Sequence, residues 1–302
     1  MIGKISTAIA LATCLASLQF VTAPASAEPL KVLSDKTVTG FGHTESVAYD
    51  PKEKVFYTGD FGPDLKPADK DGKGFITKLS ADGKVLEKNF FPPEGQTMNK
   101  PKGIWIKGRR LWVTDIDAVW VIDLKTKQGK KVDLPGAYAN DPAVVKNVLY
   151  VSDNKNDVLY RIEPADFLKA KKAPKVTKVF TGKGVNPNGL WPAKDGSLLM
   201  VGFKSKDEPR AIFKMAPGQA PKAISSPIGM LDGLYEMKNG DLLVTDWITN
   251  SLFQWNKKMG VHKLMGDIKG PADFCVVPNK QGLLVVQPDL VKGDIHFVQL
   301  GK

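Results

Sequence analysis

The sequence predicts an all-β fold, a six-bladed β-propeller whose blades are four-stranded and antiparallel. Three observations predict it: a unit of about 46 residues recurs six times, each unit supplies four short strands, and turns rich in Gly, Asp, Asn and Lys separate these strands. One blade cannot bury both of its faces, whereas blades packed around a closed ring can. A β-sandwich, the alternative all-β arrangement, would not need a repeat of this length.

Each unit opens with a polar or small pair, followed by a hydrophobic strand, a turn and a second strand that often ends in Asp. Residues 45–50 lead in this way to residues 55–60, and the same pattern starts again at Pro101, Asn140, Pro187, Leu231 and Pro271. Two further strands follow within each unit. Because Asp recurs where the second strands end, we interpret Asp60, Asp115, Asp153 and Asp246 as structural turn residues. Only residues 164–170 are a clear helical candidate.

The first 27 residues have the features of a secretory signal peptide. Lys4 supplies the positive end, residues 5–21 are mostly apolar, and Ala25-Ser26-Ala27 is a small-residue cleavage signal. We therefore expect a signal peptide over residues 1–27, cleavage near Ala27, and one propeller domain over residues 28–302 in the periplasm or secreted. A membrane anchor, or a lipid anchor at Cys14, is the weaker interpretation, because polar residues interrupt the apolar run. No transmembrane segment is expected.

The charge and the cysteine count narrow the classes of partner. The chain carries 43 Lys and Arg against 32 Asp and Glu, a formal net charge of +11. The lysines are scattered and form no stripe with aromatic residues, so we expect no nucleic-acid partner. Weak attraction to anionic envelope polymers is the alternative use of this charge. Cys14 and Cys275 are the only cysteines, which excludes a disulfide scaffold, and Cys275 is expected to be a buried, inert thiol.

Several segments resemble the six-bladed family of senescence-marker-protein-30, gluconolactonases and diisopropyl-fluorophosphatase-like hydrolases. The resemblance spans about residues 40–300 and is sharpest at Pro187-Asn188-Gly189-Leu190 with its downstream Asp-Gly turn. Leu231-Asp232-Gly233-Leu234 is similar to the Asp-Gly segment of the next blade, Glu45 to the first-blade Glu, and Asn140-Asp141 to the Asn-Asp segment. Two positions depart from the enzymes' pattern: Ser46-Val47 stands where they carry Gly-Pro, and Pro142 where they carry Gly.

The resemblance implies one divalent cation in the central channel, held by Glu45, Asn188 and Asp232, with Asn140 as a fourth ligand or a contact to metal-bound water. These residues stand near the start of the strand that opens each unit, and such positions converge on the axis of a propeller. Carboxylate and amide oxygens favour a hard cation, Ca²⁺ first and Mg²⁺ next. Zn²⁺ more often takes His or Cys ligands, although zinc is found within this group. The competing interpretation is that Asn-Gly and Asp-Gly are ordinary turn pairs.

Two functional hypotheses follow. The first is a metal-dependent hydrolase of a small lactone or ester, in which Asp232 or Asp273 accepts a proton from water. Lys102 would bind an anionic substrate or stabilise an oxyanion, or would instead pair with Asp141 or Asp273. No Gly-x-Ser-x-Gly motif is present, so hydrolysis would have to be led by the metal.

The second hypothesis is a non-enzymatic propeller that binds a ligand or protein. The Val-Thr-Asp and Val-Ser-Asp strand ends also resemble the NHL repeat, and one fold hosts many functions. A Lys-, Asp- and Gly-rich insertion at residues 65–73 is interpreted as a loop over one face of the propeller, with a cation-binding loop as the alternative. We favour the hydrolase, because the axial oxygen ligands match the family in several units.

Overall fold

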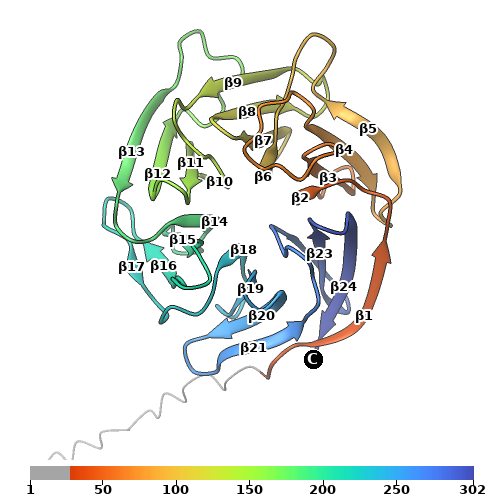
Figure 1. Cartoon of the computed structure of the whole chain (residues 1–302), viewed down its shortest axis with the longest axis vertical. Helices are drawn as coiled ribbons and strands as arrows, with labels where there is room; N and C mark the ends of the chain where they lie inside the picture. Colours follow the sequence, from red (N-terminus) through yellow and green to blue (C-terminus); the bar gives the residue numbers. More distant parts are fainter. Residues whose placement is uncertain (1–27) are drawn as a thin grey trace, which may run out of the picture.

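Six four-stranded antiparallel sheets stand around a common axis in the computed structural model, which describes residues 28–302 (Figure 1). This confirms the fold class that the repeat predicts. The predicted signal peptide, residues 1–27, lies outside the described residues. Within residues 28–302, no helix has the length and apolar character to span a membrane.

Each blade runs from an inner strand beside the axis to an outer strand at the rim. Blades 1 to 3 are β2 (Thr44–Asp50), β3 (Val55–Asp60), β4 (Phe75–Ser80) and β5 (Val85–Phe91); β6 (Pro101–Lys107), β7 (Arg110–Asp115), β8 (Ala118–Asp123) and β9 (Gly129–Asp133); and β10 (Pro142–Val145), β11 (Val148–Asp153), β12 (Val158–Glu163) and β13 (Lys175–Thr181).

Blades 4 to 6 are β14 (Pro187–Pro192), β15 (Leu198–Gly202), β16 (Ile212–Met215) and β17 (Lys222–Ala223); β18 (Leu231–Glu236), β19 (Leu242–Asp246), β20 (Ser251–Asn256) and β21 (Gly260–Met265); and β22 (Cys275–Asn279), β23 (Gly282–Asp289), β24 (Asp294–Gly301) and β1 (Lys31–Val38).

The two ends of the described chain meet in blade 6. Strand β1 is the outer strand of this blade and pairs antiparallel with β24, from Lys31 opposite Gly301 to Val38 opposite Ile295. The sixth repeat therefore supplies only three strands of its own blade. This pairing joins the first and last strands by backbone hydrogen bonds and closes the ring.

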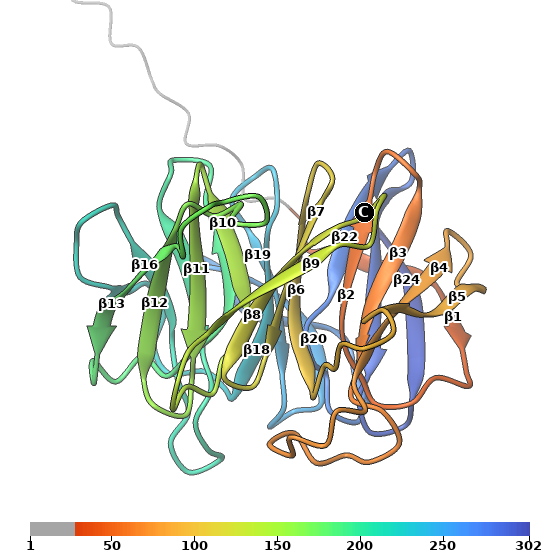
Figure 2. The ribbon, with the colours of Figure 1, turned by 90° about the horizontal axis from the view of Figure 1, so that it is seen from above.

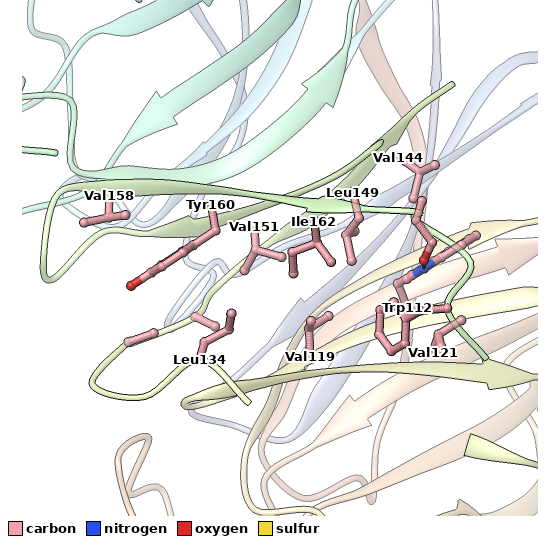
Figure 3. Packing of buried hydrophobic residues seen from close by; sticks show 14 residues of the cluster. Trp112, Val119, Val121, Leu134, Val144, Leu149, Val151, Val158, Tyr160 and Ile162 are labelled. Atoms are coloured by element: carbon pink, nitrogen blue, oxygen red, sulfur yellow. Dashed lines mark hydrogen bonds between the residues drawn. The ribbon is translucent and has the colours of Figure 1, made fainter. Parts of the chain in front are cut away.

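Apolar side chains fill the space between neighbouring blades. Between blades 2 and 3 (Figure 3), Val119 and Val121 of β8 belong to the same buried cluster as Val151 of β11. Residues 164–170 do not form the expected helix, and the elements of regular secondary structure in residues 28–302 are all strands. Instead this segment lies against the core: Phe167 is buried, and Trp112 Nε1 donates a 2.8 Å hydrogen bond to Ala165 O.

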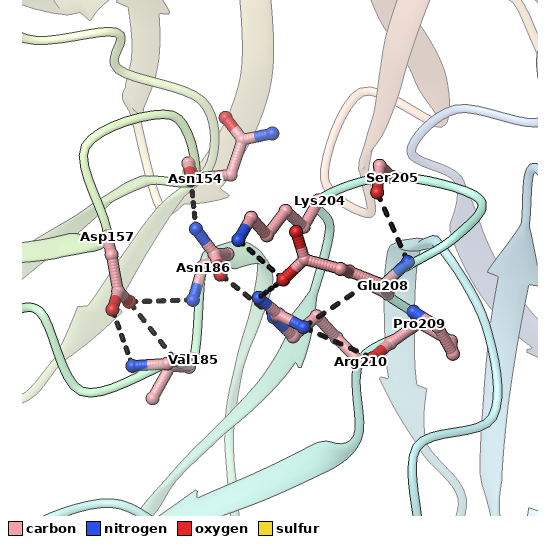
Figure 4. A network of polar contacts seen from close by, with 10 residues as sticks. Asn154, Asp157, Val185, Asn186, Lys204, Ser205, Glu208, Pro209 and Arg210 are labelled. Carbon is pink, nitrogen blue, oxygen red and sulfur yellow. Dashed lines mark hydrogen bonds and ion pairs between the residues drawn. The ribbon is translucent and has the colours of Figure 1, made fainter.

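Three of the recurring Asp residues, Asp115, Asp153 and Asp246, accept from backbone N–H groups of the loop that enters an inner strand, whereas Asp60 accepts from threonine hydroxyls of its own blade. Asp115 accepts from the backbone N–H groups of Asn99 and Lys100, and Asp246 accepts from that of Met230 at 2.9 Å. The structural interpretation of these residues is thus confirmed. Blade 4 has Gly202 at this position, and there Asp157 of the preceding blade accepts from the N–H of Asn186 at 2.7 Å (Figure 4).

The glycines at the start of three inner strands permit close packing of blades. They are Gly103, Gly189 and Gly233. A Cβ on Gly189 would lie 2.0 Å from the backbone oxygen of Asp232 in the next blade, and a Cβ on Gly103 would lie 2.3 Å from Asp141 Oδ1. None of the three has a positive φ. The Asn188-Gly189 and Asp232-Gly233 pairs therefore lie at strand starts rather than in turns.

We predict that Gly189→Ala lowers the free energy of unfolding by about 1–3 kcal/mol or more, because the added methyl group overlaps backbone that cannot move without separating two blades. Gly42→Ala is the matched control, since its Cβ would meet only Gly62 O at 3.3 Å. Chemical denaturation of both variants checks this. Equal loss in the two would show that the close approach at Gly189 is not what constrains the position.

Candidate functional site

Six side chains, one from the start of each inner strand, form what we call the axial ring. In blade order they are Glu45, Lys102, Asp141, Asn188, Asp232 and Asp273. All except Asp273 are buried. Four acids, one lysine and one amide therefore share the centre of the propeller. The ring brings together the predicted residues Glu45, Lys102, Asn188, Asp232 and Asp273.

Hydrogen bonds between blades fix the start of each inner strand. Thr114 of blade 2 donates to Asn140 O of blade 3, and Thr245 of blade 5 donates to Ala272 O of blade 6 at 3.1 Å. The N–H of Asp273 donates to Glu45 O at 3.1 Å, which links blade 6 to blade 1. The backbone that carries the ring is thereby tied together across the blades.

Asn140 stands one position before the ring, and Asp141 takes the ring position of blade 3. The backbone of Asn140 bonds to Gly103 and Ser152, whereas Asp141 accepts from the N–H of Leu190 in blade 4 at 2.7 Å. Sequence reasoning missed Asp141 as a ring member. The sequence does contain a signal that identifies Asp141. In five units the ring residue is followed directly by a small residue or proline, namely Ser46, Gly103, Pro142, Gly189 and Gly233.

The pKa of every ionisable group of the ring is shifted, mainly by burial and in part by the charges of the neighbouring ring residues. Burial raises the pKa of Asp232 to about 7, although the Trp247 indole N–H, which donates to it at 2.8 Å, lowers that pKa. Burial and then the charge of Asp232 raise the pKa of Asp273 to about 8. The pKa values of Glu45 and Asp141 are raised as well, mainly by burial. Burial lowers the pKa of Lys102 to about 8, against the effect of Glu45.

Two buried oxygens of the ring lack a hydrogen-bond partner within the described residues, Glu45 Oε2 and Asn188 Oδ1. Unpaired buried acceptors are costly, and oxygen ligands suit a hard divalent cation. The donor set therefore fits Ca²⁺ or Mg²⁺. Yet in residues 28–302 no three Asp, Glu, His or Cys side chains are grouped closely enough to hold an ion. The Asn188 amide would thus be needed among the ligands.

Lys102 points to the insertion loop rather than to an acid. Its Nζ donates to Pro67 O at 2.7 Å and lies 4.6 Å and 4.8 Å from the ring centroids of Phe61 and Tyr138. No ion pair joins it to Asp141 or Asp273 in the described part of the chain. The alternative of a salt bridge to either residue is therefore not what the structure shows.

The loop of residues 62–73 between β3 and β4 reaches the end of the channel at which the axial ring lies (Figure 2). Lys100, fully buried, donates from Nζ to Phe61 O and to Asp71 Oδ2, both at 2.8 Å. Asp69 lies 3.8 Å from Lys66. This confirms a loop over one face, and its acidic side chains at 69 and 71 pair with lysines.

A cavity of about 460 Å³ lies on the other side of the ring. Asp141 and Asp273 line its inner end, and residues further along the inner strands form its walls, including Trp105, Trp191 and Phe274. The Trp105 and Trp191 rings meet edge to face with centroids 5.4 Å apart. Cys275 also lines this cavity and is half-buried, not buried as the sequence predicted. Desolvation and the charge of Asp273 raise the pKa of its thiol, which keeps the thiol protonated.

Comparison with known proteins supports the class of fold. No protein-family model and no curated protein matches the sequence. Among solved structures, the chain resembles a streptogramin B lyase at 16% identity, with 90% of this chain and 98% of that one covered and a TM-score of 0.57.

Virginiamycin B lyase from Staphylococcus aureus is similar at 14% identity over 88% and 99% of the two chains, with a TM-score of 0.57. A chain of a nidogen/laminin complex is similar at 18% identity over 73% and 79%, with a TM-score of 0.54. At these identities the likeness shows the fold alone, and the fold is one that enzymes and binding proteins share.

We predict that, in a chelating buffer, stability falls as the pH rises from about 4 to about 8. Acids with raised native pKa values keep protons that the unfolded chain has already lost, so the native state binds more protons in this window and loses stability as pH increases. Denaturation midpoints measured between pH 5 and 8 test this. Asp273→Asn should flatten the decline, while exposed Asp133→Asn should leave it unchanged; a rise in stability across the window would contradict the prediction.

We also predict that Lys100→Met loosens the loop at residues 62–73, because it removes the buried ammonium that holds Asp71 and Phe61 O. Amide exchange in this loop, followed by mass spectrometry, should be at least about tenfold faster. Lys66→Met, which removes an exposed pair with Asp69, is the control. If both variants exchange alike, Lys100 does not hold the loop.

Proposed function

We propose that the protein is an exported hydrolase that uses a divalent cation and acts on a small lactone or ester in the central channel. The observation that carries the proposal is the axial ring, in which three acids and an amide are buried beside the half-buried Asp273. Glu45 Oε2 and Asn188 Oδ1 have no hydrogen-bond partner among residues 28–302. Buried groups with strongly shifted pKa values cluster at catalytic sites. The resemblance to the gluconolactonase-like family supports the same reaction class.

The residues of the axial ring would have different roles in the reaction, according to their position and charge. Glu45, Asn188 and Asp232 would hold the cation, Ca²⁺ first; a bound cation of this kind polarises a carbonyl oxygen and acidifies water. Asp273, with a pKa of about 8, accepts or returns a proton near neutral pH. Lys102 supplies positive charge at the loop end of the ring. Asn140 lies one residue outside the ring and has no direct part in this mechanism.

A second candidate is a binding propeller without catalysis. Two observations favour it: Lys102 places an ammonium in the ring, and no three acidic side chains of residues 28–302 converge on one point. The similar chain in the nidogen/laminin complex shows that the architecture also occurs in a protein assembly. In this case the channel would bind a small molecule and release it unchanged.

The deciding experiment measures metal and turnover on the same protein. The mature chain, purified without chelator, is expected to contain about one Ca²⁺ or Mg²⁺ per chain by elemental mass spectrometry, and Asn188→Ala/Asp232→Ala is expected to lose it. A panel of lactones and esters then tests hydrolysis, with Asp273→Asn expected to lower kcat about 10²–10⁴-fold and Asp133→Asn to have no effect. Absence of metal after incubation with millimolar Ca²⁺ would overturn the hydrolase and favour the binding propeller.

A further inference from the structure

The cavity beside the axial ring has apolar walls and an acidic inner end. Its walls come from the middle and far end of the inner strands, with Trp105 and Trp191 as the largest side chains, and Ile104, Leu190 and Leu234 also line it. Its size, about 460 Å³, lies within the range of ordinary small-molecule sites. No Lys or Arg is among the lining residues, although the chain as a whole carries a net charge of +11.

The two acids at the inner end each have a free oxygen. Asp141, 5% exposed, uses Oδ2 to accept from the N–H of Leu190, and no hydrogen bond of the described chain reaches its Oδ1. Asp273 uses Oδ1 to accept from the N–H of Phe274, and its Oδ2 is likewise free within residues 28–302. These residues come from blades 3 and 6, on opposite sides of the ring.

We propose that this cavity binds a small organic cation: a primary ammonium group on an apolar body about the size of a single aromatic ring. The ammonium donates to the free oxygens of Asp141 and Asp273, and the apolar body lies against Trp105 and Trp191. Charge-assisted hydrogen bonds are about twice as strong as neutral ones, and the two indole rings offer the apolar body a large hydrophobic contact. Burial raises the pKa of both acids, so an ammonium ion binds as they release their protons, whereas an anionic molecule would meet no Lys or Arg among the lining residues.

The inference goes beyond the proposed function because it fixes the charge and shape of the bound molecule, and it holds whether or not the ring hydrolyses that molecule. Lys102 does not neutralise the site. Its Nζ is turned to Pro67 O at 2.7 Å, on the loop side of the ring. The lining of the cavity therefore supplies no positive charge to the two free acid oxygens, and a cationic occupant would supply it.

Three probes with one apolar body and different head groups test the proposal: 2-phenylethylammonium, 2-phenylethanol and 3-phenylpropanoate, each titrated calorimetrically into the full mature protein in a chelating buffer. We expect the ammonium to bind at least about tenfold more tightly than the alcohol, and the carboxylate not to bind. Equal or tighter binding of the carboxylate, or no binding of any probe at millimolar concentration, would overturn the proposal.

Variants of the protein separate the contribution of the ammonium group to binding from that of the apolar body. Asp273→Asn should abolish the preference for ammonium over alcohol, Trp191→Ala should weaken both, and exposed Asp133→Asn should change neither. Asp141→Asn should act like Asp273→Asn, but Asp141 also holds the N–H of Leu190, so its melting temperature is measured beside its affinity. A preference that survives in a folded Asp273→Asn protein overturns the proposal. Ammonium binding without ester turnover upholds this inference while the proposed hydrolysis fails.

Discussion

The antiparallel pairing of β1 with β24 is the constraint on which the rest of the structure depends. Without it, blade 6 would expose the edge of β24. Blades 1 and 6 would then be held together by contacts such as their shared apolar cluster and the hydrogen bond from the N–H of Asp273 to Glu45 O. Ring closure also sets the distance between the inner strands. Glycines at positions 103, 189 and 233 fit this spacing, since an ordinary side chain there would meet the neighbouring blade. The axial ring thus follows from closure, because closure brings six strand starts together.

Much of the fold could be predicted from the sequence, because the repeat of hydrophobic strands records the burial of each blade face. The structural role of Asp60, Asp115, Asp153 and Asp246 could also be predicted, since Asp returns at the predicted end of the second strand in four of the six units. The role of β1 could not be predicted, because the sixth repeat contains no sequence signal for a fourth strand that comes from the other end of the chain. Residues 164–170 were misread as a helix because their apolar residues pack into the core from an irregular segment.

Five of the six ring positions could be recognised before the structure was known, because polar residues before a buried strand are unusual. In blade 3 the sequence analysis chose Asn140 instead of its neighbour Asp141. The polarity of the two residues does not fix the strand register, and a shift of one residue changes which side chain reaches the axis. The direction of Lys102 also could not be predicted. Its partner is a backbone oxygen of Pro67, and a carbonyl on a distant loop has no sequence signature.

The loop of residues 62–73, which contains the insertion at residues 65–73, makes the two ends of the channel unequal. Lys100 and Lys102 fasten this loop over one end, while the apolar cavity approaches the ring from the other. A solute that enters through the cavity therefore meets its apolar walls first and the polar ring last. It gives up the hydration of its apolar part before its polar head reaches an acid.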